Sequence, residues 1–110
     1  MIRVLITAAC SALLACAGEE QCNPTAATSC PQPALRYGDV QPIIQRRCLS
    51  CHSGLTDQWP LTDYDHVASW FDVISPELMA CRMPPPEARM GMTDEERTTI
   101  LTWLHCGFPE

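Results

Sequence analysis

Apolar side chains recur at helical spacing in the middle of the chain. Four of them occupy the i, i+3, i+4 and i+7 positions of one helical face, namely Tyr64, Val67, Ala68 and Phe71. Thr62 or Asp63, directly ahead of this stretch, can cap the helix. We expect the helix to end before Ser75-Pro76, because the residue that precedes a proline disfavours helical backbone.

The last part of the chain shows the same spacing. Thr93 is predicted to start this helix, and Glu96, three residues later, to complete a capping box. The apolar face carries Ile100, Trp103 and Leu104. Gly107 and Pro109 should stop the helix, since glycine suits the left-handed C-terminal position and proline cannot continue the helix.

An earlier short helix is predicted to follow Asp39, close to the start of the domain near Tyr37, and to lead into Cys48. Asp39 has a good N-cap side chain, and Pro42 is tolerated in the first turn, where its missing N–H would have had no partner. The residues that follow at helical spacing are Val40, Ile43, Ile44 and Arg47.

The loop before the last helix is marked by three consecutive prolines at residues 84–86. Such a run cannot be helical, and it holds the backbone extended. No convincing strand pattern occurs anywhere in the chain. Residues 37–110 are therefore predicted to be a small all-α domain of about three short helices and stiff loops.

The N-terminal residues are expected to be an export signal rather than part of the fold. Arg3 supplies a positive start, and residues 4–15 form an apolar stretch too short to span a bilayer. The stretch runs into Leu-Leu-Ala-Cys, which resembles a bacterial lipobox, so residues 1–15 would be removed and Cys16 lipidated. A buried N-terminal helix and secretion without lipid are the alternatives. Residues 16–36, with several prolines and small polar residues, are predicted to be a tether.

Composition and charge narrow the class of protein. The 110-residue chain has 8 cysteines, 10 prolines and a formal net charge of −6. Its basic residues are all arginine, and the acidic balance argues against nucleic acid or an anionic membrane surface as a partner. A core this small usually needs a disulfide, a metal or a cofactor to stabilise it.

The pentapeptide CLSCH at residues 48–52 carries the clearest chemistry in the chain. It has the C-x-x-C-H pattern by which a haem is attached through two thioether bonds, and the adjacent histidine can then bind the iron. A thiol redox motif would need a βαβ context, which the apolar pattern does not predict. The alternative is a zinc site, although exported thiols tend to oxidise. Its four ligands would be Cys48, Cys51, Cys81 and Cys106.

The chain resembles a class I cytochrome c domain, in particular the planctomycete-type domain, over residues 37–109. The segments that carry the resemblance are Val40-x-Pro42-Ile43, Arg47-Cys48-x-Ser50-Cys51-His52, Leu61-Thr62-x-Tyr64, Met83-Pro84-Pro85 and Trp103-Leu104. The resemblance implies a cytochrome c-like fold around one covalent haem c. Cys48 and Cys51 would attach the haem, and His52 and Met83 would be the axial ligands of its iron.

A thioether sulfur favours ferrous iron, so His/Met ligation would raise the reduction potential and leave no open position for a substrate. Other side chains could bind iron but more often pack or face solvent. These are Met79, Met90, Met92, His66 and His105. Members of the family also have a backbone carbonyl near a glycine and a proline that accepts the proximal histidine N–H. Gly54 and Pro60 are the candidates here, and we favour Pro60.

The remaining cysteines suggest disulfides. Cys81 and Cys106 are left once the haem pair is assigned, and we predict that they pair and tie the Met83 loop to the last helix. The bridge would close a loop of about 25 residues, which is worth roughly 3 kcal/mol in the chain-entropy model. Cys22 and Cys30, within the predicted tether, could also pair with each other.

These features predict an electron carrier rather than an enzyme. It would lie on the periplasmic side of a bacterial membrane, held there only by the lipid on Cys16, and its partners would be redox proteins. One rival is a haem enzyme or gas sensor with an open sixth position, in which Met83 only packs. The other is the zinc domain described above.

Overall fold

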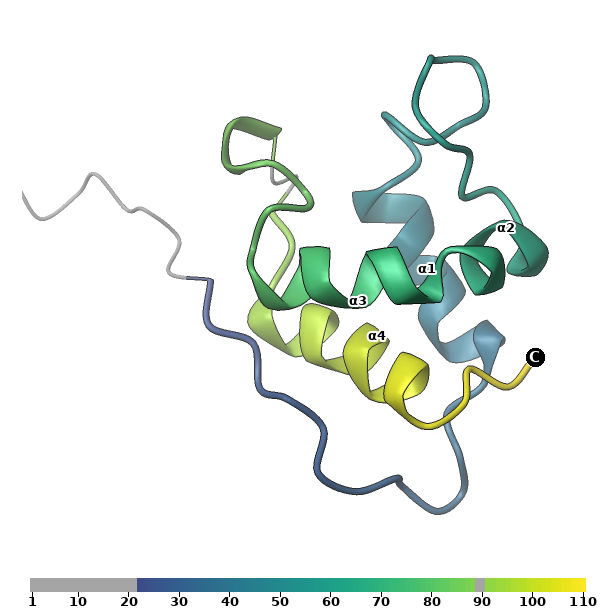
Figure 1. Cartoon of the computed structure of the whole chain (residues 1–110), viewed down its shortest axis with the longest axis vertical. Helices are drawn as coiled ribbons and strands as arrows, with labels where there is room; N and C mark the ends of the chain where they lie inside the picture. The colour runs from purple at the N-terminus through teal and green to yellow at the C-terminus, as the bar shows by residue number, and fades with distance from the viewer. Residues whose placement is uncertain (1–21, 89–90) are drawn as a thin grey trace, which may run out of the picture.

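The structure is a computed structural model that describes residues 22–88 and 91–110, and four α-helices form its framework (Figure 1). The helices are α1 (Tyr37–Arg47), α2 (Tyr64–Ser69), α3 (Phe71–Met79) and α4 (Asp94–His105), with a 3₁₀ turn at Pro86–Ala88. No strand occurs among the described residues, so the prediction of a small all-α domain is confirmed. The predicted signal at residues 1–15 and the lipidation site Cys16 lie outside the described residues.

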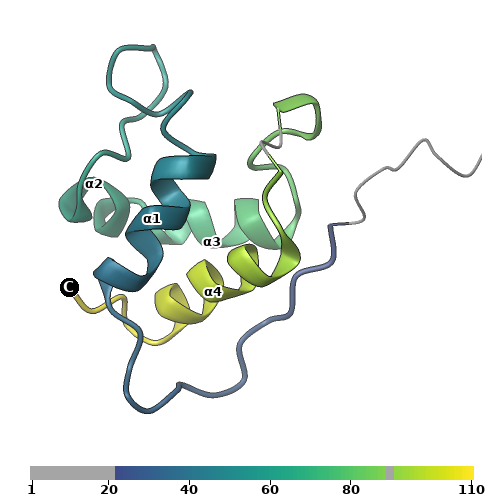
Figure 2. The same cartoon turned by 180° about the vertical axis from the view of Figure 1, so that it is seen from behind.

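The core lies where α4 contacts α1 and α3. Figures 1 and 2 show α3 and α4 side by side, with α1 running across α4. Trp103 of α4 and Val40 of α1 are both fully buried, at 0% exposure. The other buried apolar side chains are Ile43, Ile44, Val67, Leu78, Met92, Ile100, Leu101 and Leu104. Removing this apolar surface from water is the main force that holds the helices together.

The two ends of the helical domain meet at Pro109. Its carbonyl accepts hydrogen bonds from the Tyr37 N–H, at 3.0 Å, and from the Trp103 indole N–H, at 2.9 Å. Just before it, Gly107 has a φ of +92° and the Phe108 N–H donates to the Trp103 carbonyl at 2.9 Å. This is the pattern of a Schellman motif, and the predicted stop of the last helix is confirmed.

Side-chain caps start two of the helices as predicted. The Thr93 hydroxyl accepts a hydrogen bond from the Glu96 N–H at 3.0 Å, ahead of α4. The Asp63 carboxylate accepts one from the His66 N–H at 2.9 Å, ahead of α2. Each cap satisfies an N–H group that has no partner within its helix.

The start of α1 differs from the prediction. The helix begins at Tyr37 with Arg36 as its N-cap, so Asp39 is the third helical residue and not the cap. The Asp39 carboxylate reaches back and accepts the Arg36 N–H at 2.8 Å. An acidic side chain can satisfy a free N–H from inside the first turn as well as from the cap, which is why its presence alone did not locate the boundary.

The middle helix is divided and runs further than predicted. α2 ends at Ser69, and α3 starts at Phe71 and continues through Pro76, so the prediction of an end before Ser75-Pro76 is wrong. The helical hydrogen-bonding pattern continues beyond the proline, where the Ala80 N–H donates to the Pro76 carbonyl at 3.0 Å. The burial of Leu78 in the core stabilises this extra turn, and it outweighs the preference of Ser75, which precedes a proline, for a non-helical backbone.

Two disulfides fasten the N-terminal segment to the helical domain. Cys22 is bonded to Cys81, after α3, and Cys30 is bonded to Cys106, which caps the end of α4. The predicted Cys81–Cys106 disulfide is therefore wrong, and Cys22 and Cys30 do not pair with each other. Residues 22–36, predicted as part of a tether, are cross-linked to the domain instead.

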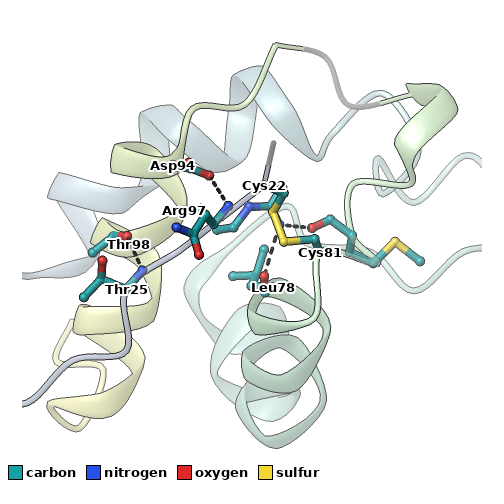
Figure 3. Close-up of a disulfide and its surroundings, with 9 residues drawn as sticks. Cys22, Thr25, Leu78, Cys81, Asp94, Arg97 and Thr98 are labelled. Atoms are coloured by element: carbon teal, nitrogen blue, oxygen red, sulfur yellow. Dashed lines mark hydrogen bonds between the residues drawn. A yellow bond between two sulfur atoms is a disulfide. The ribbon is translucent and has the colours of Figure 1, made fainter. Parts of the chain in front are cut away.

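The antiparallel arrangement of α3 and α4 explains this pairing. The Cys22–Cys81 bond lies near the start of α4, where the Asn23 N–H donates to the Asp94 carboxylate at 2.9 Å (Figure 3). Cys106 lies at the other end of the same 12-residue helix, which is about 18 Å long. A disulfide needs Cα atoms within about 7 Å of each other, so Cys81 and Cys106 are too far apart.

Candidate functional site

A cavity of about 630 Å³ opens between two loops on one side of the core. The motif loop (residues 48–61) follows α1, and the methionine loop (residues 80–88) follows α3; both rise at the top of the molecule in Figures 1 and 2. The cavity is lined mainly by apolar side chains from α1, α2, α3 and α4. Four predicted site residues also line it, namely Cys48, Cys51, His52 and Met83.

The three motif residues reach the cavity because the turn of α1 continues through them. The Cys48 N–H donates to the Ile44 carbonyl at 2.9 Å, and the His52 N–H donates to the Cys48 carbonyl at 3.0 Å. The chain therefore curls around the end of α1 rather than leaving it. Cys48 and Cys51 are in neither disulfide, so both thiols remain free on the cavity wall.

Burial sets the chemistry of the Cys48 thiol. Desolvation raises the pKa of Cys48 to about 11; the positive charge of Arg97 lowers this pKa in part, and the neighbouring Cys51 raises it. The Cys48 thiol is thus protonated at neutral pH. A protonated thiol is a poor nucleophile for disulfide exchange.

The Cys₄ zinc alternative fails on the disulfides. It requires Cys81 and Cys106 as thiolates, and both are bonded to other cysteines. Within residues 22–88 and 91–110, no group of three or more His, Cys, Asp or Glu side chains is arranged to hold a metal ion. The proposed set of four cysteine ligands is therefore not available for zinc.

His52 is oriented by its own loop. Its Nδ1 lies 2.5 Å from the Trp59 carbonyl, and its backbone carbonyl accepts the Leu61 N–H at 2.9 Å. A carbonyl can only accept, so in the neutral ring Nδ1 carries the proton and the lone pair that can bind a metal is on Nε2. The acceptor is Trp59 and not the predicted Pro60. The loop turns at Gly54, with φ of +84°, so that the carbonyl preceding Pro60 faces the ring.

Among the methionines of the described residues, Met83 is the one that lines the cavity. Its side chain is 39% exposed and lines the cavity, and its backbone carbonyl accepts a hydrogen bond from Arg97. Met92 is only 5% exposed and belongs to the core, while Met79 is exposed and does not line the cavity. Met90 lies outside the described residues.

The other two histidines lie away from the cavity. His66 Nδ1 is 3.0 Å from the Thr62 hydroxyl and 3.3 Å from the Asp63 carboxylate. His105 is exposed in the last turn of α4. Neither lines the cavity, so His52 is the histidine that can act there.

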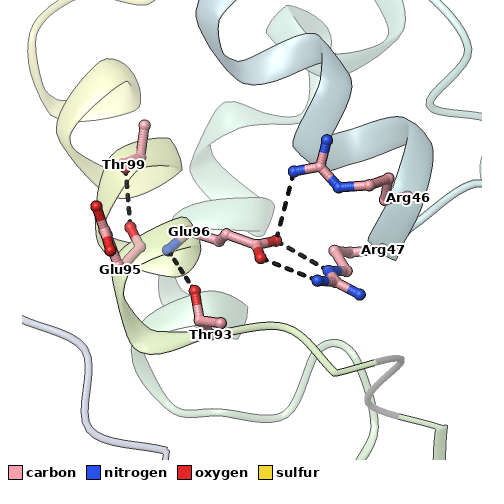
Figure 4. Close-up of polar contacts among 6 residues, drawn as sticks. All are labelled: Arg46, Arg47, Thr93, Glu95, Glu96 and Thr99. Atoms are coloured by element: carbon pink, nitrogen blue, oxygen red, sulfur yellow. Dashed lines mark hydrogen bonds and ion pairs between the residues drawn. The ribbon is translucent and has the colours of Figure 1, made fainter.

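Two charged side chains also line the cavity, and the sequence analysis assigned neither of them a role there. Arg47 donates from Nε and from a terminal nitrogen to the Glu96 carboxylate, both at 2.9 Å, and so joins α1 to α4 (Figure 4). Glu77 accepts from Arg82 at 3.0 to 3.2 Å. Arg47 directly precedes Cys48, and its position next to the motif was the feature of the sequence that could have placed it near the cavity.

No protein-family model, curated protein or solved structure matches this chain. Its function is therefore inferred from its own residues and their geometry. The two disulfides indicate an oxidising compartment, extracellular or periplasmic. None of the helices in the described residues is long and apolar enough to cross a membrane.

Proposed function

We propose that this protein is a monohaem c-type cytochrome that carries single electrons and is not an enzyme. The observation that carries the proposal is the convergence of the motif residues and Met83 on one cavity, although about 30 positions separate them in the sequence. When bound, haem c supplies a one-electron ferric/ferrous couple. The cavity fits such a group, because it is apolar and its volume lies within the roughly 300–1,000 Å³ of ligand sites.

The chain's own residues divide the work of holding the group. Cys48 and Cys51 supply thiols for two thioether bonds. Both thiols are free and both line the cavity. His52 offers Nε2 as a ligand while Trp59 holds its Nδ1–H, an arrangement that fixes the ring and strengthens a metal-binding histidine. The apolar walls exclude water, which also shapes the reduction potential.

Met83 would complete the ligation from the methionine loop. A soft thioether opposite histidine stabilises ferrous iron and leaves no open position, which suits electron transfer. Because Met83 is 39% exposed, a second candidate function is a haem enzyme or gas sensor in which Met83 leaves the sixth position open.

Carbon monoxide separates the two candidates. For a carrier, the ferrous wild type should bind carbon monoxide poorly, whereas Met83→Ala should bind it readily, lose the weak red charge-transfer band of Met–ferric ligation and show a lower potential. Met79→Ala, on exposed surface away from the cavity, is the matched control and should behave as wild type. Ready binding by the wild type would favour the enzyme or sensor.

The attachment itself is tested by extraction. After denaturation in acid–acetone the colour should remain with the polypeptide, and mass spectrometry should find the haem mass on the peptide that contains Cys48 and Cys51. Cys51→Ala should weaken or abolish maturation, whereas Ser50→Ala, between the two thiols, should not. Colour that moves into the solvent would contradict the covalent attachment.

The proposed location is the periplasmic side of a bacterial membrane. Cys16 would carry the lipid, the membrane contact would be through that lipid alone, and the partners would be redox proteins. The oxidising compartment indicated by the disulfides supports export. Cys16→Ser should move the protein from the membrane fraction to the soluble fraction. A wild type found wholly in the soluble fraction would count against the anchor.

A further inference from the structure

Arg97 is the one charged side chain in the core of the described residues, at 1% exposure. It lies on α4 among apolar neighbours such as Ile100 and Leu101. Burying a guanidinium is costly unless hydrogen bonds compensate for its lost hydration. The contacts of Arg97 must therefore compensate for this cost.

The contacts of Arg97 hold the methionine loop. One terminal nitrogen donates to the Leu78 carbonyl at 3.3 Å and to the Met83 carbonyl, while the Cys22–Cys81 disulfide fastens the chain between these two points (Figure 3). Leu78 and Met83 both line the cavity. Arg97 therefore sits directly behind the wall that carries the proposed sixth ligand.

The charge of Arg97 reaches the cavity as well as the loop. Burial is the main cause of the raised pKa of Cys48, and Arg97 opposes it by stabilising the thiolate. Cys48, the C-cap of α1, lines the same cavity as Met83. A buried charge is poorly screened by water and salt, so any charge that changes in the cavity interacts with Arg97.

We propose that Arg97 is a positioning residue for Met83 and that its buried charge favours the ferrous state of the iron. The inference rests on the proposed function. Ferric iron carries one more positive charge than ferrous iron, so a fixed positive charge behind the cavity wall disfavours oxidation. The same side chain holds the backbone of Met83, which keeps the sulfur in place in both oxidation states.

Two variants separate the two roles. Arg97→Lys keeps the charge, but its shorter side chain cannot carry a nitrogen to the point from which the terminal nitrogen of Arg97 reaches both carbonyls. Arg97→Gln loses both the charge and this reach. The matched control is Arg46→Gln, which removes an arginine charge on α1 that is 54% exposed and outside the cavity lining. The full-length protein is measured by redox titration, carbon monoxide binding and amide hydrogen exchange at residues 81–83, whose N–H groups donate to carbonyls of α3.

Arg97→Lys should bind carbon monoxide about tenfold faster than wild type and exchange the amides of residues 81–83 faster, with little change in potential. Arg97→Gln should also lower the equilibrium constant for reduction of the iron by about tenfold, which lowers the reduction potential by about 59 mV for a one-electron couple. Arg46→Gln should change each quantity by less than about twofold.

Several results would overturn the inference. The first is that both Arg97 variants match wild type in amide hydrogen exchange at residues 81–83 and in reduction potential. The second is that Arg46→Gln shifts the reduction potential as far as Arg97→Gln does. If Arg97→Gln fails to fold, unchanged exchange and carbon monoxide binding in Arg97→Lys overturn the inference. A wild type without covalent haem overturns the proposed function and this inference together, whereas a haem-bearing wild type with unaffected variants overturns this inference alone.

Discussion

The two loops that line the cavity are held in place in different ways. The motif loop is closed by its own hydrogen bonds, from His52 to Trp59, from Leu61 to His52 and from Thr56 to Cys51. The methionine loop has turn bonds to the end of α3, but its firm attachments come from afar. Cys22 is 59 positions away from Cys81, and Arg97 is 14 positions away from Met83.

The motif loop is therefore ordered by contacts that are local in the sequence, and the methionine loop by contacts that are distant in the sequence. The motif loop can take its shape as soon as α1 and the loop itself are formed, because each bond spans fewer than about ten residues and closing a short loop costs little entropy. The methionine loop depends on α4 and on the N-terminal segment. Changes far from the cavity should therefore disturb Met83 more than they disturb His52.

The largest effect should follow removal of the Cys22–Cys81 disulfide by the double replacement Cys22→Ser and Cys81→Ser. A cross-link over a loop of this length is worth about 4 kcal/mol in the chain-entropy model. We expect chemical denaturation to show this loss. In the haem-bearing protein proposed above, we expect the Met–ferric band to weaken while the histidine ligation persists. Removing the Cys30–Cys106 disulfide instead should lower stability but leave the Met–ferric band unchanged. If both double replacements weakened this band equally, the special dependence of the methionine loop on Cys22–Cys81 would be contradicted.

A smaller effect should follow Gly54→Ala in the motif loop. Gly54 has a φ of +84°, and an added Cβ would meet only Pro60 at an ordinary 3.6 Å, so the cost is backbone strain of about 1–2 kcal/mol. The strain should disturb the Trp59 carbonyl and hence His52, which thermal unfolding and the ¹⁵N shifts of the imidazole would report.

Gly38→Ala in α1 is the control for that substitution. Its Cβ would meet nothing within 4 Å, and alanine favours a helix over glycine, so stability should rise by about 0.5–1 kcal/mol. If both alanine variants changed stability in the same direction, the role assigned to the Gly54 turn would be wrong.

The ion pair between α1 and α4 should have a modest and pH-dependent effect. Hydrogen bonding to Arg47 holds the pKa of Glu96 below its usual value despite partial burial. A lowered native pKa means that the stabilisation is present above the unfolded pKa of about 4.3 and is lost as pH falls through the native value. Glu96→Gln should therefore cost about 1 kcal/mol at pH 7, and the difference from wild type should shrink towards pH 3.

Urea unfolding at several pH values measures this difference. Glu95→Gln, in the same turn but exposed, is the matched control and should show a smaller cost (Figure 4). A gap between Glu96→Gln and wild type that does not change with pH would contradict the role given to the ion pair.

The smallest effect should come from Leu55→Ser at the tip of the motif loop. Leu55 is 93% exposed, so its replacement should change the free energy of unfolding by no more than about 0.5 kcal/mol. The histidine ligation should be unaffected, because the bonds that orient His52 come from other residues of the loop. A large loss of stability on thermal unfolding would show that the tip packs against something.

The sequence by itself determined the features that depend on near neighbours. The caps at Asp63 and Thr93, the stop at Gly107 and the all-α class follow from side chains within a few positions of each helix end. The C-x-x-C-H spacing belongs to the same class, because consecutive turns of backbone carry Cys48, Cys51 and His52 to one side of α1.

Only the tertiary structure decided the features that depend on how helices pack. The antiparallel pairing of α3 with α4 puts Cys81 and Cys106 at opposite ends of α4, so each finds a partner in the N-terminal segment. The same packing buries Met92 and leaves Met83 on the cavity wall, and it carries Arg97 behind that wall. In a sequence, one cysteine, methionine or arginine cannot be told from another of the same type. Their roles here follow from the distances between side chains, which are set only when the helices pack together.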